Sequence, residues 1–364
     1  MNQSESSIEA PKDKTLKSKL TGTGLSLLTG ILWMGISIAF KKMKIDSSDV
    51  MFMRSIFQIG IFLLIVKLKR YSVWVWSVDE NQNIHKIRIL QILQGIVSGV
   101  LLVSYLVAML LMDIGDAMAI YFSSFLSTMI LSKIFLKEKV GIYKILCGVM
   151  ILAGIILVLK PSSIINDENE KVKFNASNHT KPSRPENYEM TDSNSAFYQR
   201  YYIGEISAIT SMLCLSVLSV ITIFLYENST TNSTEKSVLY SGFGILFVSL
   251  IIPFLGGNQR ILFAAKDTKP YNTLEWITLL AIALVSVVMV FTRFLALKFV
   301  GATIENFIFT SEIVFGYVAQ VIFFGAIPDI SSIIGSLCIM IACFIVPLEE
   351  VVIVRLPIRW QPFF

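Results

Sequence analysis

The chain has 364 residues, of which 54% are hydrophobic and only 16% carry a charge. A soluble globular protein of this length needs about a quarter charged residues to cover its surface, so this composition excludes an ordinary soluble domain. The formal net charge of +5 is modest and is spread over several segments, which argues against nucleic acid as a partner.

Ten strongly apolar stretches follow one another along the chain. Most of them approach the roughly 20 residues that a helix needs to cross the hydrocarbon core of a bilayer. Because they are continuous and do not alternate with polar residues, they predict helices and not barrel strands. The expected fold class is an all-α membrane protein with ten transmembrane helices. The predicted spans cover residues 21–40, 50–66, 89–111, 117–134, 141–159, 202–225, 237–254, 274–297, 300–324 and 331–346.

A polar stretch in the middle of the chain divides the spans into two sets of five. Two homologous units with an odd number of spans must enter the membrane in opposite directions, so we expect two inverted five-helix repeats. Shifting the second half back by about 188 residues places Ser311 on Ser123, which supports common ancestry of the halves. The expected organisation is a cytosolic tail over 1–20, a first repeat over 21–159, a flexible external or lumenal loop over 160–201, a second repeat over 202–347 and a cytosolic tail over 348–364.

Charged residues and sequons indicate the orientation. Lys and Arg are more frequent on the segments that a cytosolic N-terminus places in the cytosol. The central loop contains sequons at Asn175 and Asn178, which are glycosylation candidates and fit an external or lumenal position. A second pair of sequons, at Asn228 and Asn232, lies on a loop that this orientation places in the cytosol. Glycosylation at that pair would show that the orientation is the opposite one. We therefore expect an integral multi-pass membrane protein, with the plasma membrane and an endomembrane of the Golgi or ER both left open.

The fourth and fifth spans resemble a known family. They combine an alanine that leads the fourth span, a Leu-Lys-Glu turn, glycines in the fifth span and a proline after it. This pattern resembles an EamA domain of the drug/metabolite transporter superfamily. The start of the second span is similar to the G group of solute carrier family 35, and the second half is a more divergent copy. The resemblance implies the ten-helix fold and a transport activity. The residues that carry it are Ala117, Leu136, Lys137, Glu138, Gly148, Gly154 and Pro161, with Met53 to Gln58 in the second span.

Ionisable residues inside spans cost roughly 2.5 to 3.5 kcal/mol near the bilayer centre, so each needs a physical reason. Arg293 and Glu305 lie at matched depth on either side of a turn, which predicts a gate or structural salt bridge, with separate snorkelling as the alternative. Glu312 lies about 10 Å deeper, near the midplane, where the sequence offers no cation. Its position is that of a glutamate in many EamA domains. It is either a proton-exchanging or substrate-contacting carboxyl or a structural hydrogen-bonding group.

Other polar residues are candidates for a substrate pocket. Arg54, near the external end of the second span, either snorkels outward or holds an anionic substrate. Gly95 and Gly99 let another helix approach the third span closely. Uncharged hydrogen-bonding groups on spans three, four and nine suit a midplane pocket. They are Tyr105, Tyr121, Ser124, Asn306 and Thr310.

The sequence contains no phosphate-binding loop, nucleophile elbow or metal-ligand spacing, so we expect no enzyme activity, cofactor or metal. The expected partners are the lipid bilayer and a small-molecule substrate, and a homodimer is left open. The favoured hypothesis is a secondary transporter or exchanger of a small polar metabolite, with an organic anion suggested by Arg54 and Arg293. The alternatives are a non-transporting membrane scaffold or regulator that retains the fold, and a nucleotide-sugar transporter, which the scarcity of basic residues in the spans disfavours.

Overall fold

The computed structural model describes residues 16–43, 47–70, 84–111, 114–138, 141–159, 192–228, 234–256, 271–324 and 330–346. Within these ranges the chain is helical apart from short turns, so the expected all-helical class is confirmed. Asn175, Asn178 and Asn232 lie outside the described residues.

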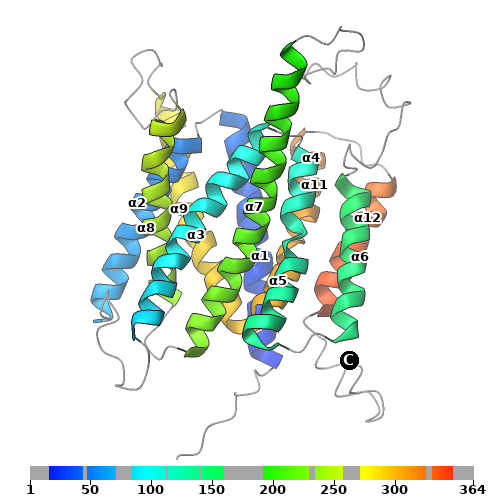
Figure 1. Cartoon of the computed structure of the whole chain (residues 1–364), viewed down its shortest axis with the longest axis horizontal. Coiled ribbons are helices and arrows are strands. Elements are labelled where there is room, and N and C mark those ends of the chain that lie inside the picture. Colours follow the sequence, from blue (N-terminus) through cyan, green and yellow to red (C-terminus); the bar gives the residue numbers. More distant parts are fainter. Residues whose placement is uncertain are drawn as a thin grey trace, which may run out of the picture.

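Ten helical stretches follow one another in the described part of the chain, and two of them are interrupted. Their bounds agree with the predicted spans to within a few residues, except that α7 begins well before the predicted start of the sixth span. In Figure 1 this early part of α7 projects beyond the neighbouring helices. In chain order the elements are α1 (Leu16–Met43), α2 (Ser47–Leu68), α3 (Ile84–Leu111), α4 (Ile114–Phe122), α5 (Ser124–Leu131), the π-helical turn η1 (Ser132–Leu136), α6 (Ile142–Leu159), α7 (Asp192–Asn228), α8 (Thr234–Gly256), α9 (Thr273–Val300), α10 (Ala302–Phe309), α11 (Glu312–Phe324) and α12 (Ile330–Ile345).

Five helices of the described chain are long and apolar enough to cross a membrane. Their exposed side chains are also largely apolar, as expected where the surrounding medium is hydrocarbon. The segments that meet this standard are Ser48–Leu68, His85–Met109, Tyr202–Glu227, Thr234–Ile251 and Thr273–Val300.

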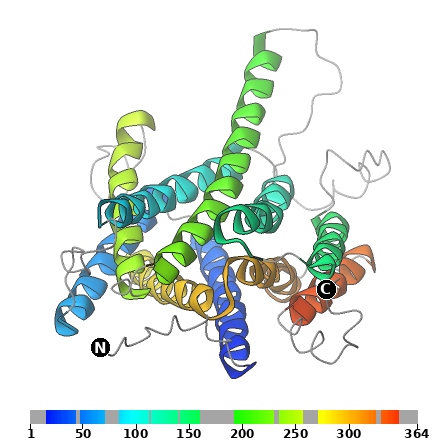
Figure 2. The same cartoon turned by 60° about the horizontal axis from the view of Figure 1, so that its bottom comes forward.

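Helices from the two halves of the chain pack against each other. α1 packs on α9, α10 and α11, while α3 packs on α7 and α8. α2 lies against α8 and α9, and α6 pairs with α12 at one edge of the bundle (Figures 1 and 2). A Cβ atom on Gly95 would lie 2.7 Å from the carbonyl oxygen of Tyr240, and one on Gly99 would lie 2.6 Å from that of Gly244. The predicted close approach at these glycines is therefore confirmed, with α8 as the partner helix.

Two of the stretches break near their middle, at Ser123 and Ser311. The Ser123 amide donates to the Ile120 carbonyl at 3.2 Å, and the Ser311 amide donates to the Ile308 carbonyl at 2.9 Å. These bonds span three residues instead of four, which tightens the helix locally and interrupts its regular ladder. The two serines are the pair that the internal repeat superposes. Glu312 is the first residue of α11, directly after the second break.

Candidate functional site

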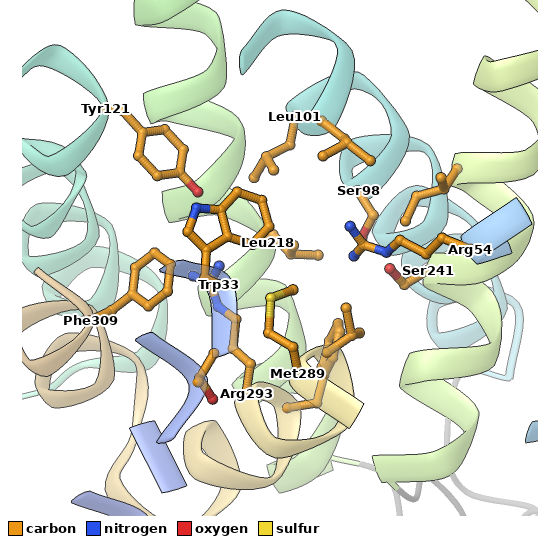
Figure 3. Close-up of a pocket in the computed structure, with 15 residues that line it drawn as sticks. Trp33, Arg54, Ser98, Leu101, Tyr121, Leu218, Ser241, Met289, Arg293 and Phe309 are labelled. Atoms are coloured by element: carbon orange, nitrogen blue, oxygen red, sulfur yellow. The ribbon is translucent and has the colours of Figure 1, made fainter. Parts of the chain in front are cut away.

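A small pocket lies at the centre of the bundle, between helices of both halves (Figure 3). Its volume is about 50 Å³, which holds one or a few water molecules and is far below the roughly 300 Å³ of a small-molecule pocket. Leucine, isoleucine, methionine and phenylalanine side chains form much of the wall. Its polar and aromatic lining consists of Thr29, Trp33, Arg54, Ser98, Tyr121, Ser241, Arg293, Phe294 and Phe309.

Arg54 enters the pocket from α2 and is only 8% exposed. Its Nε atom has no hydrogen-bond partner, and no carboxylate of the described residues forms an ion pair with the guanidinium. Figure 3 shows Ser98 and Ser241 beside it, and the buried Ser98 hydroxyl also lacks a partner among the described residues. A buried cation with unmatched hydrogen-bonding capacity is a group that an anion can satisfy.

Arg293 lies on another wall of the same pocket, and its charge is balanced. Its Nε atom lies 3.4 Å from Oε1 of the fully buried Glu305. Its guanidinium carbon lies 4.3 Å from the ring centroid of Phe309, a cation–π contact. Arg293 thus joins α9 to α10 through one charged and one aromatic contact at the centre of the bundle.

Glu312 lies just outside the pocket lining and is 1% exposed. Neither of its carboxyl oxygens accepts a hydrogen bond of ordinary geometry from the described residues. The sequence predicts no cation at this depth. Arg293 is near enough to act electrostatically on the Glu312 carboxyl, but the two side chains, both within the described part of the chain, form no ion pair.

The uncharged candidates divide into two groups. Tyr121 lines the pocket, and Tyr105 lies behind it, with its ring centroid 4.6 Å from that of Tyr121. The other three make structural hydrogen bonds instead. The backbone carbonyl of Ser124 accepts from the Ser216 hydroxyl at 3.0 Å, the Asn306 side chain donates to the Ser219 hydroxyl at 3.0 Å, and the Thr310 hydroxyl donates to the Asn306 carbonyl at 3.0 Å. These bonds hold the interrupted stretches in place.

Sequence reasoning missed several residues of the pocket wall. Trp33 on α1, Ser98 on α3 and Ser241 on α8 line the pocket together with Arg54. Ser98 lies between Gly95 and Gly99, where α3 and α8 approach closely. Its position among these small residues could have identified it from the sequence as a polar residue between two helices. Trp33 is surrounded by apolar residues in the sequence and carries no comparable signal.

Hydrogen bonds join the two halves at both ends of α9. At its start, the Tyr271 hydroxyl donates to Oδ2 of Asp49, the third residue of α2, at 2.6 Å. Beyond its end, the Thr303 hydroxyl donates to Oε2 of Glu138, in the turn after η1, at 2.7 Å. The central pocket lies between these two contacts.

Comparisons with known proteins agree with this architecture. Residues 20–160 match the EamA-like transporter family. The chain is 24% identical over 340 residues to solute carrier family 35 member G1 of Homo sapiens, covering 89% of this chain and 78% of that protein. It is 23% identical over 333 residues to the Mus musculus protein of the same name, covering 90% and 78%. A protein crystal structure with 15% sequence identity superposes with a TM-score of 0.62, covering 90% of this chain and 98% of the other, which shows a common fold.

Proposed function

Because residues 20–160 of this chain belong to the EamA-like transporter family, we propose that the protein is a secondary transporter or exchanger that moves a small organic anion by alternating access. Membership of this family indicates an integral multi-pass membrane protein that acts in transport and not as an enzyme. The observation that carries the finer proposal is Arg54, a buried guanidinium in the central pocket with no acidic partner among the described residues.

The proposed mechanism needs ten transmembrane helices arranged as two inverted five-helix repeats. Helix packing supports this arrangement, because each contact between the halves has a counterpart with the halves exchanged. α1 packs on α9 and on the interrupted stretch of α10 and α11, as α7 packs on α3 and on the interrupted stretch of α4 and α5. Inverted repeats of this kind place the substrate near the midplane, at interrupted helices. Movement of one half against the other then opens the site to each side in turn.

Charge balance in the pocket favours an anionic substrate. The positive charge of Arg293 is balanced by Glu305, whereas Arg54 has no corresponding acid. A guanidinium binds a carboxylate or phosphate through two parallel hydrogen bonds. Ser98 and Ser241 line the pocket beside it and supply hydroxyl donors for the same anion. Of the two pocket arginines, only Arg54 has a positive charge that no acid of the described residues balances. One such charge suits a small anion better than the diphosphate of a nucleotide sugar.

The pocket volume and the contacts around it support alternating access. A volume of about 50 Å³ is too small for most metabolites, so the helices around Arg54 must separate to admit one. The hydrogen bonds from Tyr271 to Asp49 and from Thr303 to Glu138 join the halves at opposite ends of α9. Breaking one while keeping the other would open the pocket to one side only, which is the requirement for a transporter that does not leak.

Transport in proteoliposomes tests the proposal. Purified protein is reconstituted and challenged with radiolabelled monocarboxylates, dicarboxylates, inorganic phosphate, amino acids and nucleotide sugars. We expect uptake of a small anion that Arg54→Gln abolishes and Arg54→Lys reduces, because lysine keeps the charge but not the paired donors. Lys17→Gln removes a positive charge from an exposed position of α1 and is the matched control.

The result that contradicts the proposal is equally specific. Folded wild-type protein that moves none of these anions would favour the alternative of a non-transporting scaffold or regulator. Transport of a nucleotide sugar would overturn the choice of a small anion as substrate. Transport of an anion at unchanged rate by Arg54→Gln would remove Arg54 from the substrate site.

A further inference from the structure

A second, larger hollow lies on the outer face of the bundle, between α2 and α9. Its volume is about 370 Å³, and its walls are almost entirely apolar. On α9, Val287, Val288 and Phe291 face this groove, whereas Met289 and Arg293 line the central pocket. Val288 is 52% exposed, so the groove opens on the surface that hydrocarbon covers in a membrane. We call it the lateral groove.

The length of the lateral groove corresponds to one leaflet. Along α2 it runs from Lys69 back to Ile61, which at 1.5 Å per residue is about 12 Å. Along α9 it runs from Leu284 to Phe291, or about 10 Å. Half of a hydrocarbon core of about 30 Å is about 15 Å. The groove therefore starts at one membrane surface and ends near the midplane, as the path of a single acyl chain does.

Positive charge is concentrated where the groove meets that surface. Lys67, Lys69 and Arg70 are exposed at the end of α2. Lys69 forms an ion pair of 2.5 Å with Glu235 at the start of α8, and both residues line the groove. Lys67 and Arg70 form no ion pair within the described residues. Lys67 lies on the opposite side of α2 from the groove, about 200° around the helix from Ile65. At the groove itself, Lys69 and Arg70 therefore supply two positive charges against the single negative charge of Glu235, at the depth of lipid phosphates.

We propose that the lateral groove is a binding site for a phospholipid with an anionic headgroup. One acyl chain lies along Phe62, Val288 and Phe291, and the headgroup lies against the basic end of α2. An apolar groove alone would accept any hydrocarbon, but the basic rim adds a preference for negative charge. The bound lipid contacts the face of α9 opposite to Arg293. This inference does not depend on the transport proposal, because it uses a different surface and a different ligand.

Native mass spectrometry of the full-length protein tests this proposal, with phosphatidylglycerol and phosphatidylcholine of identical acyl chains as probes. We expect the wild type to retain one phosphatidylglycerol and to prefer it to phosphatidylcholine. Arg70→Gln should weaken phosphatidylglycerol retention about fivefold, since a basic residue near the surface contributes about 1 kcal/mol to binding an anionic lipid. Lys67→Gln removes a charge from the opposite side of α2 and should weaken retention less. Val288→Trp should abolish retention by filling the groove.

Leu337→Trp is the control, because Leu337 on α12 is 57% exposed and lies outside the groove. It should leave retention unchanged and shows that an added surface tryptophan is tolerated. Thermal unfolding of each variant without lipid confirms that it is folded. Equal retention of the two lipids would overturn the anionic preference, and undiminished retention by Val288→Trp would overturn the location. A dimer mass that Val288→Trp reduces would assign the groove to a second copy of the chain instead.

Discussion

Replacing Arg54 with methionine should stabilise the protein in the absence of its substrate. Arg54 lies about seven residues, or 10 Å, from the start of α2, inside a segment apolar enough to cross the membrane. Its guanidinium is buried without an acidic partner among the described residues. Methionine has similar length and suits a wall that already contains Leu102, Ile245 and Met289. The substitution thus removes an unbalanced charge with little change in packing.

The size of the effect follows from the depth of the residue. An arginine at the centre of a membrane helix costs about 2.5 to 3.5 kcal/mol, and Arg54 lies about two thirds of the way to the centre. We therefore expect Arg54→Met to raise the free energy of unfolding by about 2 kcal/mol. An unfolding entropy of about 2.1 cal/mol/K per residue amounts to roughly 0.8 kcal/mol/K for 364 residues, so this stabilisation raises Tm by about 3 °C.

Thermal unfolding in detergent measures this increase, and adding the transported anion provides the second half of the test. At 100 times its Kd, an anion that binds only the folded state stabilises the wild type by about 2.7 kcal/mol. Arg54→Met should show no such stabilisation. Lys17→Gln, which removes an exposed charge, should resemble the wild type in both measurements.

The opposite result would refute the reasoning. If Arg54→Met lowers Tm by several degrees while the anion still stabilises the variant, then Arg54 is held by protein groups and the anion binds elsewhere. A lower Tm with loss of the anion effect would also contradict the claim that the guanidinium is unbalanced.

Three further predictions concern the centre of the bundle. Glu312→Gln should fold, because the amide is nearly isosteric with the carboxyl. It should slow transport and flatten the dependence of transport on pH, whereas an unchanged rate and pH profile would limit Glu312 to a structural role. Removing the charge of Arg293 or Glu305 alone should lower the free energy of unfolding by about 3 to 5 kcal/mol. A double-mutant cycle in Tm should show coupling between the two residues, and no coupling would mean that the two charges act separately. Gly99→Ala should destabilise the protein by about 1 to 3 kcal/mol, because the new Cβ would lie 2.6 Å from a backbone carbonyl, whereas Gly24→Ala, with nothing within 4 Å, should not.

The sequence by itself determined the membrane class, the helical segments and their approximate ends. The reason is that transfer of a segment into hydrocarbon depends on the sum of its residues, which a single stretch of sequence contains. The same reasoning singled out Arg54, Arg293, Glu305 and Glu312, because a charge inside an apolar span stands out without any knowledge of its neighbours. The recurrence at Ser123 and Ser311 was visible for a similar reason, since a repeat is a property of the sequence alone.

Only the tertiary structure decided which of these residues share a site. Membrane helices are apolar on the sides that face lipid and on the sides that face other helices, so hydrophobicity does not reveal which face turns inward. Close contacts such as those of Gly95 and Gly99 with α8 set the rotation and separation of the helices. That packing places Arg54 and Arg293, from opposite halves of the chain, in one pocket with Trp33. It also turns the side chains of Asn306 and Thr310 toward structural hydrogen bonds and gives the Ser124 carbonyl a donor in Ser216, because each interrupted helix needs partners where its own ladder is broken.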